Sequence, residues 1–573
     1  MKKPITLLFV LLLVSGSLWS QLSGTYTVGS GGNYATIAAA IDALNTSGVV
    51  APGVTFNVLA GHTESATTTL TITATGTSTA PIVFQKSGTG ANPLITRMDA
   101  GTISTSSLSA DGDAIIKLSG TDYITFNGID LTANNQGIEY GYYTFKPSGT
   151  DGCQYVTIKN STVTMTKGTS AYVIGIYISN GPTSPSAVTG VTVTSTSGIN
   201  SNIVISGNTI TNVHAGIYIR GSSATGFYDS DITIGQLGAE NTITNFGGGN
   251  VSATYGIYFI YVNNPTVEYN TITSATHGST LYGVFYSTVS GIVKGNYNAF
   301  TLANNSASSL TYFIYNANTV TSEAFNNNTF AAGTLSSTGT VYLIYASNGT
   351  PEVNINNNSI SGSINRTGAS GSFYCYYNLG SPTSGSENIQ NNNFSNITVT
   401  GSSSLYGIYS YTSTSVSTRT CSGNILSNWI GGTGSTYGYY LLSTIDNNIY
   451  NNIFYHVNVG GAVYALRFTG TNPNVYNNII SDITTSGSSV YGIYDAGTGI
   501  SQVYNNQVNK LFSNATSVTM DGIYITGATT NYVFNNIVGE LKVPFSGSTI
   551  GLVGIYISGG SSIGLYYNTV YLD

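Results

Sequence analysis

The chain has 573 residues, of which 41% are apolar and only 6% are charged, and its formal net charge is −7. Since a typical soluble domain carries about 25% charged residues, Ser, Thr, Asn and Gly must provide most of the polar surface. The sequence contains no cluster of Lys and Arg, which excludes a nucleic-acid-binding protein.

Residues 1–20 predict a secretory signal peptide. Lys2 and Lys3 precede an apolar run from Leu7 to Val14, and small residues follow up to Ser20. The run is too short to span a bilayer, and no later segment is apolar enough to cross one. We therefore expect an exported protein, secreted or held at the cell surface, without a membrane-spanning segment after the signal peptide.

Residues 21–110 are expected to form an N-terminal cap and the first, irregular coils of the fold. From Tyr34 onward, one helical face collects four apolar residues, namely Ile37, Ala40, Ile41 and Leu44, and 45–48 end the helix. Such a helix can cover the open end of a stack of strands. Two insertions, 181–200 and 221–240, are expected to bulge from turns.

A repeat of about 30 residues continues through 111–573. Its register mark is the second Asn of a turn, found at Asn208, Asn241, Asn270, Asn298, Asn328, Asn358, Asn392, Asn424, Asn448, Asn478, Asn506, Asn536 and Asn568. An apolar residue stands two positions after each. Short strands at this period, with almost no helical pattern, predict an all-β fold, a parallel β-solenoid with about three strands per coil.

Asparagine suits these turns for two reasons. It tolerates the left-handed conformation that a sharp corner needs. In a stack of identical coils, its amide can donate to the next Asn and accept from the previous one, which satisfies buried polar groups.

A second column follows the Gly-Ile-Tyr strands. Its members are Tyr177, Tyr218, Tyr258, Phe285, Tyr315, Tyr345, Tyr376, Tyr409, Tyr440, Arg467, Tyr494, Tyr524 and Tyr556. Because strand side chains alternate between faces, this column should point outward if the preceding aliphatic residues point inward. One hypothesis is a stacking ladder that only stabilises adjacent coils. The other adds ligand binding, with exposed rings contacting sugars and the neighbouring Gly leaving room for a ligand.

The Gly-Ile-Tyr strands and Asn-x-Ile turns resemble the right-handed parallel β-helix repeats of the pectate-lyase-like superfamily. The resemblance runs from about Asn127-Gly-Ile129 to the end, about four-fifths of the chain. It implies the fold and no single activity, because the superfamily includes lyases, hydrolases, esterases and non-catalytic surface proteins. The composition looks most like that of secreted surface proteins of Bacteroidetes-type bacteria. Such proteins usually end in a sorting domain, so a sequence stopping five residues after Asn568 is expected to be truncated.

If the chain were an enzyme, the resemblance would imply one of two residue sets. The lyases of that superfamily carry acidic calcium ligands and a basic residue, and the hydrolases carry paired aspartates and a Gly-His-Gly turn. The sequence shows neither an adjacent Asp pair nor a Gly-His-Gly. Asp229 and Asp231 would share one strand face, with Glu240 close in sequence, so a calcium site is one hypothesis for them and a solvated loop is the other. No other cofactor or metal site is expected. Glu139, Asp495 and Asp521 are candidates for a site assembled from distant coils.

These observations favour an adhesin-like or carbohydrate-binding scaffold without catalysis, on a bacterial surface or secreted. The expected partner is a polysaccharide or a cell-surface glycan. The alternative is a polysaccharide lyase or glycoside hydrolase acting on an acidic polysaccharide, which needs carboxylates or a basic residue on the tyrosine-bearing face.

Overall fold

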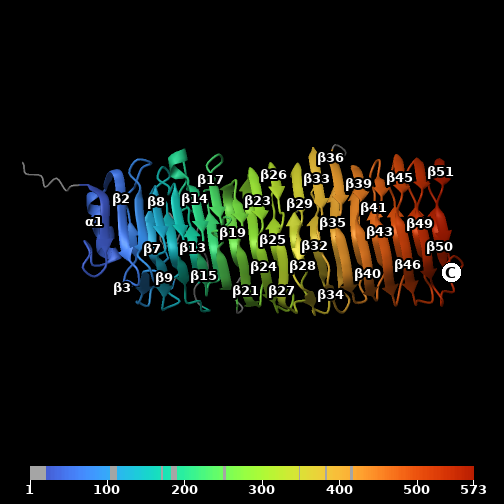
Figure 1. Ribbon diagram of the computed structural model, residues 1–573, viewed down its shortest axis with the longest axis horizontal. Coiled ribbons are helices and arrows are strands. Elements are labelled where there is room, and N and C mark those ends of the chain that lie inside the picture. The colour runs from blue at the N-terminus through green and yellow to red at the C-terminus, as the bar shows by residue number, and fades with distance from the viewer. Residues whose placement is uncertain are drawn as a thin grey trace, which may run out of the picture.

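The computed structural model describes residues 21–103, 112–169, 172–181, 190–248, 253–346, 349–380, 384–412 and 417–572. These residues form a parallel β-solenoid of about 17 turns, with one short N-terminal α-helix. Figure 1 shows the coils stacked in chain order along one long axis. The solenoid predicted from the repeat is therefore confirmed. The predicted signal peptide lies outside the described residues.

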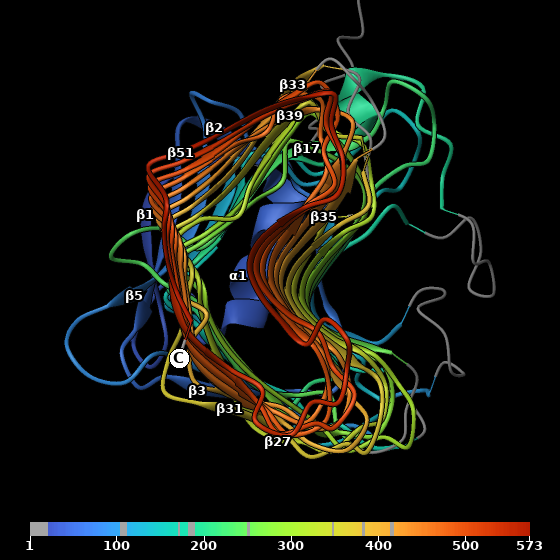
Figure 2. The ribbon, with the colours of Figure 1, turned by 90° about the vertical axis from the view of Figure 1, so that its right-hand side faces the viewer.

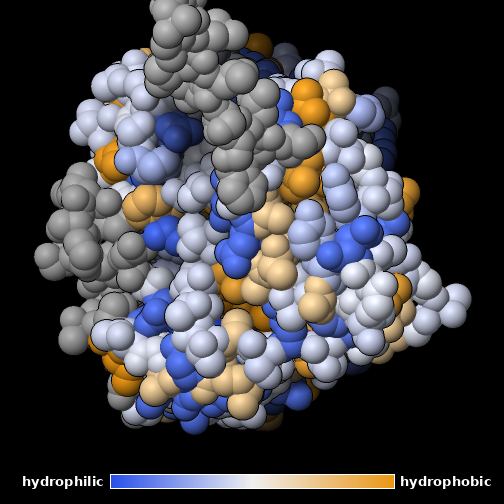
Figure 3. Space-filling view, turned by 90° about the vertical axis from the view of Figure 1, so that its left-hand side faces the viewer, coloured by the Kyte–Doolittle hydropathy of each residue, from blue (hydrophilic) through white to orange (hydrophobic). Residues whose placement is uncertain are grey.

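The N-terminal end is closed by α1 (Ile37–Ser47). Thr36 caps the helix by accepting a hydrogen bond from the Ala39 amide, and the Glu64 carboxylate accepts from the amides of Ile37 and Ala38. All four residues of the predicted apolar face are buried. Figure 2 shows α1 lying across the interior of the coils, and the end face in Figure 3 carries its apolar residues in small groups among polar ones. The predicted capping helix is confirmed.

The first coils contain β1 (Leu22–Val28) and eleven further strands, which pair in parallel. They are β2 (Val49–Leu59), β3 (Thr63–Ala66), β4 (Leu70–Ile72), β5 (Ile82–Ser87), β6 (Leu94–Arg97), β7 (Ala114–Ser119), β8 (Ile124–Asn127), β9 (Asp130–Ala133), β10 (Tyr140–Phe145), β11 (Val156–Lys159) and β12 (Thr162–Thr164). A 3-10 turn, η1 (Thr196–Gly198), lies in the first insertion.

From there each coil contributes one strand to each of three parallel ladders, except that one coil contributes two short strands to the third ladder. The tyrosine-strand ladder, which continues from β10, consists of β13 (Ile174–Ile178), β16 (Ala215–Arg220), β19 (Thr254–Asn263), β22 (Leu281–Ser290), β25 (Thr311–Asn316), β28 (Val341–Ala346), β32 (Ser372–Asn378), β35 (Ser404–Thr412), β38 (Thr436–Ser443), β41 (Val463–Phe468), β44 (Val490–Asp495), β47 (Met520–Ile525) and β50 (Leu552–Ile557).

The middle ladder consists of β14 (Ser201–Ser206), β17 (Asp229–Ile234), β20 (Thr266–Glu268), β23 (Ile292–Asn296), β26 (Ser322–Ala324), β29 (Glu352–Asn356), β33 (Gly385–Gln390), β36 (Ser417–Ser422), β39 (Asp446–Tyr450), β42 (Asn474–Tyr476), β45 (Ile500–Tyr504), β48 (Thr530–Phe534) and β51 (Ser562–Tyr566). The third ladder consists of β15 (Thr209–Thr211), β18 (Thr242–Phe246), β21 (Thr271–His277), β24 (Ala299–Asn304), β27 (Thr329–Leu335), β30 (Ser359–Ile360), β31 (Ile364–Arg366), β34 (Ile397–Val399), β37 (Ile425–Ile430), β40 (Ile453–Val459), β43 (Ile479–Thr485), β46 (Gln507–Ser513), β49 (Ile537–Lys542) and β52 (Thr569–Tyr571).

An asparagine ladder joins the coils at the corner between the middle and third ladders. The Asn328 amide N and Nδ2 both donate to Asn358 Oδ1, at 2.9 and 3.1 Å, and Nδ2 also donates to the Gly295 carbonyl. The same pattern links successive coils up to Asn568, and most of these side chains are buried. The left-handed conformation falls on the residue before, such as Asn327 or Asn357 with φ of 58°. The two roles predicted for Asn are thus divided between neighbouring residues.

One member of the predicted asparagine column is wrong. Asn424 donates to Asn452 Oδ1 and Asn452 to Asn478 Oδ1, so Asn452 belongs to the ladder and Asn448 does not. Asn448 lies inside β39, where it pairs with Asn474 in the next coil. Two Asn-Asn-Ile runs stand four residues apart here, and only the second falls at the corner.

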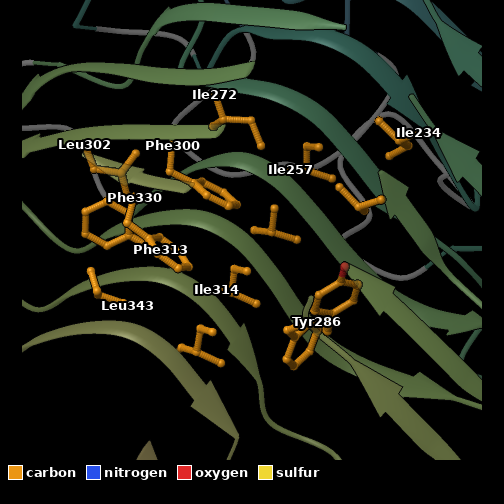
Figure 4. Close-up of a cluster of buried hydrophobic side chains, with 14 of the residues drawn as sticks. Ile234, Ile257, Ile272, Tyr286, Phe300, Leu302, Phe313, Ile314, Phe330 and Leu343 are labelled. Carbon is orange, nitrogen blue, oxygen red and sulfur yellow. The ribbon is translucent and has the colours of Figure 1, made fainter. Parts of the chain in front are cut away.

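The core runs along the interior of the coils. In Figure 4, Ile257 and Ile314 from the tyrosine-strand ladder face Ile272, Phe300 and Phe330 from the third ladder. The rings of Phe300 and Phe330 stack at 5.6 Å, and Phe313 packs edge-on against Phe330 at 5.7 Å. The three cysteines, Cys153, Cys375 and Cys421, are buried and free. Within the described residues, no helix is both long and apolar enough to cross a membrane.

Candidate functional site

The tyrosine-strand ladder carries two outward columns of aromatic rings. In β19 the residues Gly256 and Ile257 are both buried, while the rings of Tyr255 and Tyr258 lie 4.5 Å apart. A Cβ on Gly256 would meet Ile272 Cγ2 at 2.6 Å and the Gly283 carbonyl at 2.5 Å. The room beside the Tyr is therefore taken by core packing and leaves no space for a ligand, which corrects the role expected for this Gly.

The sequence interpretation missed the second of these columns. The second tyrosine column consists of Tyr255, Tyr282, Tyr312, Tyr342, Tyr374, Tyr406, Tyr437, Tyr464 and Tyr491, aligned by strand register. Consecutive rings lie 4.4–5.2 Å apart with planes within 18° of parallel. The Tyr-x-x-Tyr spacing in the sequence could have revealed this second column. Strict alternation of strand side chains places residues three apart on opposite faces, so that assumption hid it.

The first tyrosine column is the column that the sequence predicted, with one residue replaced by its neighbour. Strand register pairs Tyr345 with Tyr377 and Tyr377 with Tyr409, so Tyr377 is the member and Tyr376 is not. Tyr376 is fully buried, and its hydroxyl donates to Glu387 Oε1 at 2.8 Å. Glu387 in turn accepts from Arg419 Nε at 2.6 Å. This buried polar cluster, which the sequence did not indicate, holds Tyr376 inside the coil.

Exposure divides the first column into two parts. The rings of Tyr177, Tyr218 and Tyr258 are 3%, 5% and 7% exposed and form a buried cluster with Tyr140, Tyr143 and Tyr172. From Phe285 onward the remaining aromatic members, Tyr315, Tyr345, Tyr377, Tyr409, Tyr440, Tyr494 and Tyr524, are partly exposed, and Tyr556 is exposed. We call the two columns from Tyr282 to Tyr524 the tyrosine face. Figure 2 shows that the coil outline bends inward on the side that carries β35.

The two columns stand at a steep angle to one another over much of the tyrosine face. The rings of Tyr342 and Tyr345 are inclined by 85°, those of Tyr406 and Tyr409 by 86°. Two nearly perpendicular sets of rings cannot both lie flat across the long axis. At least one column is therefore inclined to the long axis.

Burial keeps the tyrosine hydroxyls protonated. It raises the pKa of Tyr282, Tyr342, Tyr406 and Tyr491 to about 12, and neighbouring tyrosines add to the shift. At neutral pH these phenols therefore remain hydrogen-bond donors as well as acceptors.

Two charged residues interrupt the columns. Arg467 takes a position in the first column, with its guanidinium carbon 5.1–5.3 Å from the ring centres of Tyr440, Tyr464 and Tyr494. Asp521 follows Tyr491 in the second column, and burial raises its pKa to about 6. Within the described residues, neither Arg467 Nε nor Asp521 Oδ1 has a hydrogen-bond partner. All three candidate carboxylates, Glu139, Asp495 and Asp521, are buried.

The candidate calcium ligands are not brought together. Asp229 is buried and pairs with Lys146 Nζ at 2.5 Å, whereas Asp231 is exposed. Asp231 adopts a φ of 55°, which breaks the strand alternation expected for these two carboxylates. Glu240 is exposed and accepts from the Gly238 amide. Among the described residues, no three His, Cys, Asp or Glu side chains are grouped as metal ligands.

No family model and no curated protein matches the chain. Solved structures similar to it include an alginate lyase from Paenibacillus sp. str. FPU-7, at 14% identity and a TM-score of 0.31, covering 62% of this chain and 97% of the other. PfbA, a surface adhesin of Streptococcus pneumoniae, is similar at 13% identity and a TM-score of 0.31, over 73% and 86% of the two chains. A mannuronic acid specific polysaccharide family 6 lyase from human gut microbiota is similar at 12% identity and a TM-score of 0.25. This match covers 87% of this chain and 86% of the other. The structural neighbours of this parallel β-solenoid therefore include polysaccharide lyases and a surface adhesin.

Proposed function

We propose that this protein is an exported, non-catalytic solenoid of the bacterial surface, of the kind found in Bacteroidetes-type bacteria, that binds glycan chains along the tyrosine face. The observation that carries the proposal is the pair of adjacent aromatic columns on the strands from β22 to β47, interrupted by Arg467 in β41 and by Asp521 in β47. At ~4.8 Å per coil, these strands extend over roughly 40 Å. That length suits a polymer lying along the long axis.

The chemistry of the tyrosine face matches that of a sugar chain. Aromatic rings offer apolar surface to the C–H faces of sugars, and their partly polar edges carry hydroxyls. Tyrosine loses little conformational entropy on binding because it has two side-chain torsions. Here neighbouring rings hold each other in place, with centroid separations such as 5.0 Å between Tyr312 and Tyr342. A ligand would therefore meet a preorganised surface.

Charged groups are sparse on this face. A glycoside hydrolase needs two carboxylates flanking the bond to be cleaved. Within the described residues of the two columns from Tyr282 to Tyr524, Asp521 is the one carboxylate and Arg467 the one cation. They belong to strands two coils apart, so the coil spacing alone separates them by about 10 Å.

Asp521 nevertheless favours a second candidate, a lyase acting on an acidic polysaccharide. Its buried carboxyl lies beside Tyr491 in the second column, and its raised pKa of about 6 is in the range that a general base needs. The test is cleavage of polygalacturonate and alginate with and without calcium. Cleavage that is lost in Asp521→Asn would establish this second candidate and reject the non-catalytic one.

The binding proposal is tested with a glycan array followed by titration of the best polysaccharide. Replacing Tyr345, Tyr377 and Tyr409 by Ala removes three rings from the first column. Replacing Tyr342, Tyr374 and Tyr406 by Phe keeps the stack and removes three hydroxyls. We expect at least a tenfold weaker Kd for each triple variant, because several hydrogen bonds or ring contacts of about 1 kcal/mol are lost.

The matched control uses a stack elsewhere on the surface. Tyr450, Tyr476 and Tyr504 of the middle ladder stack at 4.9 and 5.0 Å with planes 6° and 7° apart. Their triple Ala variant should retain full binding. If the control variant loses affinity as much as the two face variants, or if all three bind as the parent does, the tyrosine face is not the site.

A further inference from the structure

An open pocket lies on the outward side of the middle ladder, near the start of β11, β14 and β17. Its volume of about 410 Å³ is within the range of small-molecule sites. Each of three successive coils contributes two described residues to its lining, namely Tyr155 and Thr157, Asn202 and Val204, and Asp231 and Thr233. None of these residues belongs to the tyrosine face.

One edge of the pocket is a column of residues with left-handed backbone. Strand register aligns Tyr155 with Asn202 and Asn202 with Asp231, and their φ angles are 56°, 53° and 55°. Tyr123 precedes them and Asn264 follows them in the same column. An aromatic ring, an amide and a carboxylate therefore follow one another along this edge at the coil spacing of ~4.8 Å.

Tyr155 offers one face of its ring to the pocket. The other face is covered by Tyr123 of the preceding coil, with ring centroids 4.3 Å apart and planes 11° apart. The next coil has the shorter Asn202 in this column, so the stack ends at Tyr155, which is 44% exposed. The uncovered aromatic face is an apolar platform for the C–H face of a sugar ring.

The two polar members of the column have hydrogen-bonding capacity to spare. Asp231 Oδ1 accepts from Asn264 Nδ2 at 3.2 Å, and Asn202 Nδ2 donates to Ser201 Oγ at 3.3 Å. Within the described residues, Asp231 Oδ2 and Asn202 Oδ1 accept no hydrogen bond. Adjacent hydroxyl groups of a sugar are donors that such oxygens can accept from.

The charge and the length of the pocket restrict its ligand. Asp231 is the one charged residue among the six that line the pocket, so an anionic ligand is repelled and an uncharged hydrogen-bond donor is favoured. Tyr155 and Asp231 stand two coils apart, about 10 Å. That distance accommodates one sugar ring stacked on Tyr155, with Val204 beneath it and its hydroxyls directed toward Asp231.

We infer that this pocket binds one neutral pyranose unit, which stacks on Tyr155 and donates hydrogen bonds from adjacent hydroxyls to Asp231 and Asn202. The site goes beyond the function proposed above and does not depend on it, because it lies on a different ladder. It would hold a single uncharged sugar, whereas the tyrosine face would hold a chain.

Titration calorimetry tests the inference. The neutral probes are the methyl glycosides of glucose, galactose and mannose, and the anionic probe is D-glucuronate. We expect at least one neutral glycoside to bind and glucuronate to bind less tightly, a difference that added salt should narrow by screening Asp231. Tyr155→Ala removes the platform and should weaken binding of the neutral glycoside about tenfold. Asp231→Asn should also weaken it about tenfold and should reduce the discrimination against glucuronate.

Two further features separate a lost site from a disturbed fold. Asn tolerates left-handed backbone, so Asp231→Asn should keep the fold. Tyr297 is the matched control for Tyr155, because its φ is 57°, it is 48% exposed and its ring stacks on Tyr269 at 4.7 Å. Tyr297→Ala should leave the Kd of the neutral glycoside unchanged, as should the triple Phe variant of the tyrosine face.

The inference is overturned if the parent binds none of the three neutral glycosides or binds glucuronate as tightly as it binds them. Parent-like binding by both Tyr155→Ala and Asp231→Asn would also overturn it. If the triple Phe variant loses the monosaccharide, the tyrosine face is the site and this pocket is not.

Discussion

The tyrosine columns contain two regions that share one strand motif and differ in what surrounds the rings. In the region of β13, β16 and β19, the first-column rings are buried, and neighbouring rings meet at steep angles, such as 88° between Tyr177 and Tyr218. In the region from β22 to β44, the rings other than that of the buried Tyr312 are partly exposed, and the second column stacks in parallel. The first region lies where two insertions leave the coils, and the second follows the plain repeat.

The difference shows that a repeated residue does not have one role along a solenoid. Each coil contacts only its neighbours, so a ring's environment depends on the local turns as much as on the strand. In the first region the tyrosines act as a small outer core. In the second they remain a surface, which is the region we propose for glycan binding. Three predictions test this division.

The largest expected effect is on stability. Tyr218→Ala removes a ring that is 5% exposed and should lower the free energy of unfolding by about 3–5 kcal/mol, the cost of emptying a buried aromatic site. Tyr409→Ala removes a half-exposed ring and should cost about 1 kcal/mol. Urea unfolding of both variants measures the contrast. Equal losses would show that the two regions do not differ in packing.

The asparagine ladder should show no such contrast. Asn241 and Asn478 lie in the two regions and make the same bonds, each donating through Nδ2 to the next Asn and to a backbone carbonyl. Replacing either by Ala should cost about 1–3 kcal/mol, because buried partners lose their bonds. Asn448 lies outside the ladder, so Asn448→Ala is the matched control and should lower the free energy of unfolding by less. A ladder variant that unfolds at the same urea concentration as Asn448→Ala would contradict this account.

The sequence predicted the solenoid, the capping helix and most of the asparagine ladder, because these depend on periodicity. Its two register errors have the same cause. The predicted step from Asn424 to Asn448 is 24 residues, well below the other steps of the repeat. With Asn452 as the member, the steps from Asn424 to Asn452 and from Asn452 to Asn478 are 28 and 26 residues. Likewise Tyr374 and Tyr377 keep the Tyr-x-x-Tyr spacing that Tyr376 breaks. Coil length and paired spacing would have resolved both.

The rest depends on contacts between distant segments and could not be predicted from spacing. The burial of Tyr177 and Tyr218 and the pairing of Lys146 with Asp229 both depend on residues that come from several different coils. Asp229 and Asp231 illustrate the limit. Their spacing suggested a shared face, but the left-handed backbone at Asp231 separates them.

The smallest expected effect is a pH dependence of the exposed region. The pKa of Tyr342 and Tyr406 is about 12 in the folded protein, whereas an unperturbed tyrosine has a pKa of about 10. Between these values the unfolded chain has lost its protons and the folded chain has kept them, so the free energy of unfolding falls as pH rises. This stabilisation is complete below pH ~10. Because the side chains are half exposed, we expect the free energy of unfolding to fall by less than about 1 kcal/mol per pH unit for each tyrosine.

The double variant with Phe at both positions keeps the stack without the ionisable groups, so its urea midpoint should fall less steeply above pH ~10 than that of the parent. Phenolate absorbance provides the independent measurement, and a parent in which these tyrosines ionise with their ordinary pKa would show that the rings are not buried against one another as the structure has them.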